Sequence, residues 1–150
     1  MSKLSVNLRQ QAIRHGLCRL WRKEWSDDSS EQELIDKFKK GLDFCIANDF
    51  PDLEVMHRHF DRGLLHRNLI FVDETVSLDD APNGVYVLNG ACTGVLRFRS
   101  WAAATVHVRH SSHIHIIAED FAKVFVRLYD GADADICDLS GSVVKVYDRR

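Results

Sequence analysis

The pattern of apolar and polar residues changes near residue 68 of this 150-residue chain. Before that point, apolar residues recur three or four positions apart, which is the spacing of a helix that buries one face. After it, apolar and polar residues alternate between regularly placed turn residues, which is typical of β-strands. The sequence therefore predicts an α+β fold, with a helical region over residues 1–68 and a β-repeat region over residues 69–150.

The helical region is predicted to contain about three helices. The first covers about residues 6–24, where apolar side chains fall on one helical stripe. The second covers about residues 30–48 and begins with a capping box, in which the side chains of Ser30 and Glu33 each accept a hydrogen bond from the other residue's backbone N–H. The third is short and covers about residues 51–60, with a proline at its start.

Turn residues recur about every ten positions from residue 89 onward. Aligned on these turns, the corners of the repeat are Asn89-Gly90, Arg99-Ser100, Arg109-His110, Glu119-Asp120, Tyr129-Asp130, Cys137-Asp138 and Tyr147-Asp148. Every step between neighbouring corners is ten residues, except for a step of eight that ends at Cys137-Asp138. The sequence therefore predicts a regular ten-residue unit with one shortened copy.

Side chains within each strand of the repeat divide between two faces, because successive residues of a strand point to opposite sides. Val106, for example, is expected to face a core, and His107 beside it to face away. The same alternation places His115, Phe125 and Lys145 on the outside. We predict that this outward row, formed by His107, His115, Phe125 and Lys145, is a surface for protein binding or self-association.

Two architectures fit a ten-residue unit of strand and turn. In an antiparallel β-sandwich or barrel, neighbouring turns lie at opposite ends of a sheet and usually differ in type. In a β-solenoid, every corner has a similar environment, so similar corner residues recur. The corners of this chain share residue types and mostly lack the Asn-Gly or Asp-Gly signal of tight hairpins. A small β-solenoid is therefore the favoured prediction, and a sandwich or barrel is the alternative.

Two segments of the repeat, Val-Arg-Leu-Tyr-Asp-Gly-Ala at residues 126–132 and Val-Lys-Val-Tyr-Asp at residues 144–148, resemble tandem bacterial repeats of the form V-x-A-Y-D-x-A. Those repeats occur in uncharacterised proteins, some from phages and mobile elements, and are expected to form β-solenoids. The segment Gly-Leu-Asp-Phe-Cys-Ile at residues 41–46 is similar to the helical N-terminal part of phage-type proteins. The resemblance implies a phage-related β-solenoid protein and supplies no active site.

Composition and charge narrow the function classes. The formal net charge is −2, which gives no reason to expect a polyanionic partner. The four cysteines match no zinc-binding spacing, and Cys18 and Cys45 fall on or beside apolar helix stripes, so buried free thiols are predicted. No apolar run reaches the roughly 18 residues of a membrane span, and the first residues lack a signal-peptide core. We therefore predict a protein that makes no membrane contact and is cytoplasmic, with export by a route other than cleavable secretion as the alternative.

Four histidines gather between residues 107 and 115. His113 and His115 are two apart on a predicted strand, so their side chains share a face and are placed to share a metal ion. The sequence alone shows no third ligand of fixed geometry, so a solvated face without metal is the favoured interpretation, and no cofactor is predicted.

The start of the chain is basic, because residues 1–23 contain six Lys and Arg residues and no acidic residue. Arg19, Arg22 and Lys23 would contact phosphate groups if the protein bound nucleic acid, a hypothesis that the net charge does not favour.

No complete catalytic motif is present, so no catalytic residue is assigned. The favoured hypothesis is a non-enzymatic interaction or structural protein that binds another protein or forms a homo-oligomer. The alternatives are a nucleic-acid-binding regulator and a metal-binding protein.

Overall fold

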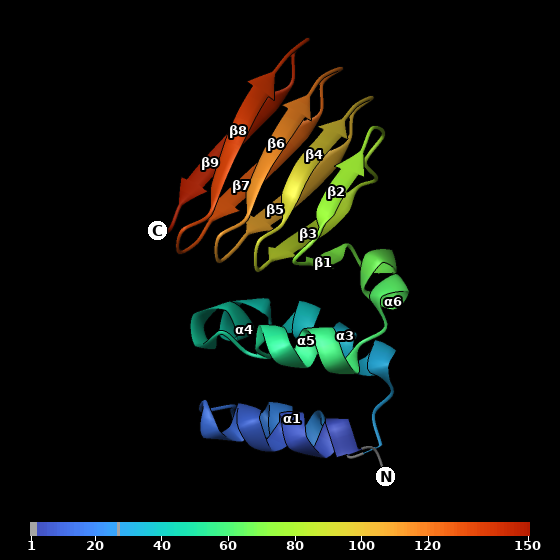
Figure 1. Cartoon of the computed structure of the whole chain (residues 1–150), viewed down its shortest axis with the longest axis vertical. Coiled ribbons are helices and arrows are strands. Elements are labelled where there is room, and N and C mark those ends of the chain that lie inside the picture. Colours follow the sequence, from blue (N-terminus) through green and yellow to red (C-terminus); the bar gives the residue numbers. More distant parts are fainter. Residues whose placement is uncertain (1–2, 27) are drawn as a thin grey trace. The chain divides into compact units, whose positions relative to one another are not determined.

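The computed structural model describes residues 3–26 and 28–150 of the chain (Figure 1). The chain divides into two units, Met1–Leu64 and Leu65–Arg150. The boundary predicted from the sequence, after residue 68, lies four residues further along the chain. Among the described residues, the first unit contains only helices, and every strand belongs to the second. The predicted α+β class is therefore confirmed. No helix in the described part of the chain is long and apolar enough to cross a membrane.

The prediction of about three helices is wrong, because residues 3–26 and 28–150 contain six. The helices are α1 (Lys3–Arg14), α2 (Arg19–Glu24), α3 (Glu31–Lys40), α4 (Leu42–Asn48), α5 (Leu53–His59) and α6 (Arg62–Arg67). Helix α6 was not predicted; it begins beside Asp61, whose carboxylate accepts a hydrogen bond of 2.9 Å from the backbone N–H of Leu64. An acceptor at this position satisfies one of the N–H groups that a helix leaves unpaired at its start.

Gly16 divides the first predicted helix. Its φ angle is +94°, a left-handed conformation that side chains rarely adopt. The backbone N–H of Gly16 donates to the carbonyl oxygen of Ile13, and that of Leu17 donates to the carbonyl oxygen of Ala12, each at 3.0 Å. This pair of hydrogen bonds is the Schellman motif that ends helices at a glycine. The predicted capping box at Ser30 is confirmed, because the Ser30 side chain accepts from the N–H of Glu33 and the Glu33 carboxylate accepts from that of Ser30.

The second unit is a parallel β-solenoid, as predicted, and the antiparallel alternative is wrong. Its strands are β1 (Ile70–Val72), β2 (Thr75–Leu78), β3 (Gly84–Asn89), β4 (Thr93–Phe98), β5 (Ala103–Val108), β6 (His113–Ala118), β7 (Lys123–Leu128), β8 (Asp133–Asp138) and β9 (Val143–Asp148). One sheet has the order β1-β3-β5-β7-β9 and the other has the order β2-β4-β6-β8. Each strand pairs in parallel with the strand two places along the chain, so one coil contains one strand of each sheet (Figure 1).

The ten-residue period is fully regular from β4 onward, so the predicted shortened unit is wrong. Strands β7, β8 and β9 begin at residues 123, 133 and 143, ten apart each time. Cys137 and Asp138, which resemble corner residues in sequence, lie inside β8 and pair with Ile117 and Ala118 of β6. The corner follows at Leu139 and Ser140.

The core of the solenoid consists of stacked rows, because a coil of two ten-residue units brings residues 20 apart into register, as in the pairing of Ile116 with Ile136. The predicted inward positions are fully or almost fully buried in the coils before the last, namely at Leu96, Phe98, Val106, Val108, Ile114, Ile116, Val124 and Val126. Small residues at the inner corner are also buried, namely Cys92, Ala102, Ser112, Ala122 and Ala132. The alternation in the sequence therefore identified the core residues of these coils.

Candidate functional site

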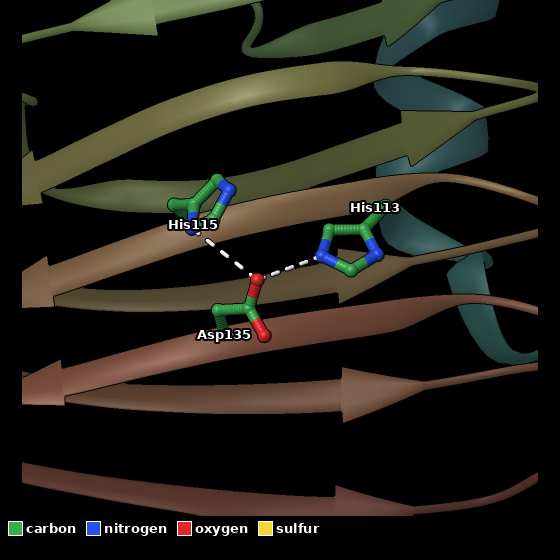
Figure 2. Close-up of side chains that lie close together, drawn as sticks. All are labelled: His113, His115 and Asp135. Carbon is green, nitrogen blue, oxygen red and sulfur yellow. Dashed lines mark hydrogen bonds and ion pairs between the residues drawn. The ribbon is translucent and has the colours of Figure 1, made fainter.

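Three ionisable side chains meet on the outward face of the sheet that contains β6 and β8. His113 and His115 lie two apart on β6, and Asp135 lies on the neighbouring strand β8, in register with His115 (Figure 2). Strands in a sheet are about 4.8 Å apart, and residues two apart on one strand share a face. The backbone register therefore brings together three side chains that lie up to 22 positions apart in the sequence, from His113 to Asp135. All three are exposed.

One carboxylate oxygen lies between the two imidazole rings of this cluster. Oδ2 of Asp135 is 2.8 Å from Nε2 of His113 and 3.3 Å from Nδ1 of His115 (Figure 2). The hydrogen bond between His113 and Asp135 raises the pKa of His113 and lowers the pKa of Asp135 from their ordinary values. The two groups therefore stabilise each other as an ion pair. His113, His115 and Asp135 each offer one nitrogen or oxygen atom that could bind a metal ion, and these three atoms lie within 4.8 Å of one another.

The structure places His113 and His115 on one face, as the alternation predicts, and adds Asp135, which the sequence analysis missed. Asp135 could be found only from the 20-residue coil, because it follows His115 by one full coil. The ten-residue unit is visible in the sequence, but the number of units in a coil is not. Whether the histidines bind a metal stays a prediction at this point.

His107 is only 5% exposed, so the prediction that it faces solvent is wrong. Its ring stacks on Tyr129 at a centroid distance of 5.9 Å, and its Nδ1 lies 3.1 Å from the Tyr129 hydroxyl. The alternation along β5 places the His107 side chain on the face opposite to the buried side chains of Val106 and Val108. It gives no information about what covers an outward position, and this is why the exposure was predicted wrongly.

The predicted outward row does not form one surface. His115 belongs to the sheet that contains β6, whereas Phe125 and Lys145 are neighbours in the other sheet. Phe125 and Lys145 lie beside an exposed aromatic residue, Tyr147, whose ring stacks on that of Phe125 at 6.5 Å. The structure therefore replaces the predicted row with two separate outward faces, and protein binding by either face stays a prediction.

The last coil exposes residues from inward positions. Ile136 of β8 is 37% exposed and Val146 of β9 is 46% exposed, although Ile116 and Val126, their partners in the preceding coil, are fully buried. Within the described residues, β8 and β9 are the last strands of their sheets and have a strand neighbour on one side only (Figure 1). These two strands form the terminal edge of the solenoid, an apolar strip flanked by backbone groups of edge strands.

Two aromatic residues stack at a corner of the solenoid. The rings of Trp101 and Phe121 are 4.8 Å apart and nearly parallel, and Trp101 is 72% exposed. This pair was not predicted, although Trp101 and Phe121 are also separated by one 20-residue coil. Both have positive φ angles, of 67° and 64°, which are rare for aromatic residues.

The three basic residues proposed to contact nucleic acid all lie on α2, a helix of six residues. Arg19 and Lys23 are exposed, but Arg22 is half-buried, and its Nε donates a hydrogen bond of 2.7 Å to the backbone carbonyl of Leu17. Arg22 therefore serves the local fold of the helical unit. Nucleic-acid contact by these residues stays a prediction.

None of the four cysteines, all of which the structure describes, forms a disulfide, and the predicted burial is correct for Cys45 but wrong for Cys18, which is exposed. Cys92 is buried and Cys137 is exposed on β8.

The fold and the exposed groups define a parallel β-solenoid protein with a helical N-terminal unit. Comparisons with protein-family models, with curated proteins and with solved structures give no match. The resemblance to phage-type bacterial repeats therefore stays a prediction.

Proposed function

We propose that this protein is a non-enzymatic interaction protein that associates with a second copy of itself through the terminal edge. The observation that carries the proposal is the exposure of Ile136 and Val146, which occupy positions that are fully buried one coil earlier. Burial of apolar area is favourable by about 25 cal/mol per Å². A partner that continues the stack would bury both side chains and would pair the edge backbone groups.

A second copy fits this edge because the edge complements itself. Consecutive strands of the coil run in opposite directions, as β8 and β9 do in Figure 1. A two-fold axis parallel to the strands places β8 of one copy against β9 of the other, in antiparallel orientation, and generates both pairings at once. Such an isologous contact closes on itself and gives a dimer.

Charge selects this arrangement over a two-fold axis perpendicular to the sheets. The outward side chains of β8 include Asp133 and Asp135, and those of β9 include Lys145. Pairing β8 with β9 brings acidic residues beside a basic one, whereas pairing each strand with its own copy brings like charges together. Stacking the terminal edge on the other end of the solenoid is disfavoured, because Ile70, Phe71 and Val72 of β1 are already buried.

Light scattering during size-exclusion chromatography tests the proposal on the 150-residue chain. We expect a dimer, and we expect Val146→Lys to give a monomer, because an ammonium group would be buried at the contact. Val85→Lys is the matched control, since Val85 is 41% exposed on an outward face and away from the terminal edge. A monomeric parent chain at high concentration, or a dimer that survives Val146→Lys, would overturn the proposal.

A charge exchange tests the pairing of β8 with β9. Lys145→Asp and Asp133→Lys should each weaken the dimer, and the double variant should restore it, because the opposite charges then meet again. If each strand pairs with its own copy, the double variant will behave no better than the single ones.

We propose that this association occurs in the cytoplasm, because exposed free thiols such as those of Cys18 and Cys137 persist in a reducing compartment.

A further inference from the structure

The cluster of His113, His115 and Asp135 has the composition and the spacing of a metal-ligand set. We propose that these three side chains bind a divalent metal ion of the zinc class on the outward face of the solenoid. Asp135 lies on β8, a strand of the terminal edge, but its side chain shares the outward face of the sheet with His113 and His115, so the site is complete within one copy and does not require self-association.

The distances between the donor atoms match a shared ion. Two ligand atoms bound to one tetrahedral zinc ion, each at about 2.1 Å, lie about 3.4 Å apart. Oδ2 of Asp135 lies 2.8 Å from Nε2 of His113 and 3.3 Å from Nδ1 of His115. The third separation, between the two imidazole nitrogens, is within 4.8 Å. Small rotations of three exposed side chains therefore suffice to surround an ion.

The donor types select the metal. Two imidazole nitrogens and one carboxylate oxygen suit zinc, copper, nickel and cobalt, whereas calcium and magnesium prefer sets made of oxygen alone. Three protein ligands leave at least one coordination position for water. The carboxylate of Asp133, in register with His113, adds a second negative charge that favours a cation at this face.

The fold holds the ligands in place before an ion arrives. Strand β6 pairs with β4 on one side and with β8 on the other, so the backbone under both histidines is fixed by two ladders. Asp135 lies on β8 and is held by the ladder between β6 and β8. Ligands on paired strands keep their relative positions better than ligands on loops do, and such preorganisation lowers the cost of binding.

Isothermal titration calorimetry with zinc chloride tests the site in untagged protein from which metals have been stripped. We expect one zinc ion per chain, and we expect Asp135→Asn and His113→Ala each to weaken binding by more than the roughly 10–100-fold that changes in outer-shell residues cost. The ring resonances of His113 and His115 should also broaden when copper(II) is added, which locates the ion directly by nuclear magnetic resonance.

Asp133→Asn is the matched control for Asp135→Asn, because it removes the same charge from the same face of the same strand. It should change the affinity only slightly if Asp135 is a ligand. Equal losses in the two variants would show general attraction to negative charge and would overturn the site. An absence of zinc binding, or zinc binding that is retained in His113→Ala, would overturn it as well. The Val146→Lys variant should bind zinc normally, so failure of one proposal is distinguishable from failure of the other.

Discussion

The solenoid repeats one environment, whereas each helix of the N-terminal unit has an environment of its own. In the solenoid, residues 20 apart stack in register, so Ile116 lies directly beside Ile136. In the helical unit, the end of α1 depends on a single residue, Gly16, and on the hydrogen bonds that its conformation allows. Periodicity therefore predicts a repeat fold well, because an error in assigning one corner leaves the other corners intact. Helix boundaries have no such redundancy.

The largest expected effect tests whether equivalent positions in the repeat are equivalent in energy. Ile116→Ala should lower the free energy of unfolding by about 2–5 kcal/mol, since it leaves a cavity in a closed core. Ile136→Ala removes the same atoms from the next coil but should cost clearly less, because the Ile136 side chain is 37% exposed. Urea denaturation followed by circular dichroism measures both values.

The measurement on Ile136→Ala should be made at low protein concentration, where association does not contribute to stability. Equal losses for the two variants would mean that the last coil is as well packed as the one before it. The inner coils and the terminal edge would then not differ in packing.

A smaller loss of stability is expected when a side chain is added at Gly94, where the repeat contains a glycine. Gly94 pairs with Ile114 of the next coil, so the repeat alone suggests that an apolar side chain fits there. The backbone contradicts this: Gly94 has a φ of +130°, and a Cβ atom would lie 1.8 Å from the carbonyl oxygen of Val76. Gly94→Ala should therefore destabilise the protein by about 1–3 kcal/mol, as overpacking does.

Thr93→Ala is the control for Gly94→Ala, since Thr93 is the exposed neighbour on β4. Its effect on the urea midpoint should stay within about 0.5 kcal/mol. A Gly94→Ala variant as stable as the parent chain would show that β2 and β4 can separate at this point without cost. The first coil would then be more tolerant than the later ones.

The sequence predicted what depends on local alternation and missed what depends on three-dimensional register. The alternation identified the buried rows, for example Val124 and Val126, and placed His113 and His115 on one face. It did not identify Asp135, because the number of strands in a coil follows from how the chain closes on itself. It also predicted exposure for His107, which Tyr129 stacks against.

The helical unit shows the opposite balance between local and long-range information. The capping box at Ser30 was predicted from two residues and is present, because a cap is made within one turn of the chain. The first predicted helix is divided at Gly16 and the second at Gly41, and neither division was predicted. Glycine is tolerated inside many helices, so it marks a helix end only in context. Local signals therefore predicted a start better than they predicted an end.

The smallest expected effect tests this local information in isolation. Ser30→Ala removes the side chain that accepts the N–H of Glu33, so α3 should lose about 1 kcal/mol of stability. Ser77→Ala makes the same chemical change at an exposed position of β2 and should alter stability by no more than about 0.5 kcal/mol. Thermal melts followed by the helical circular dichroism signal compare the two variants. If Ser30→Ala leaves the melt unchanged, the start of α3 is determined by packing rather than by its cap, and the helical unit depends on tertiary contacts even where its sequence signal is clearest.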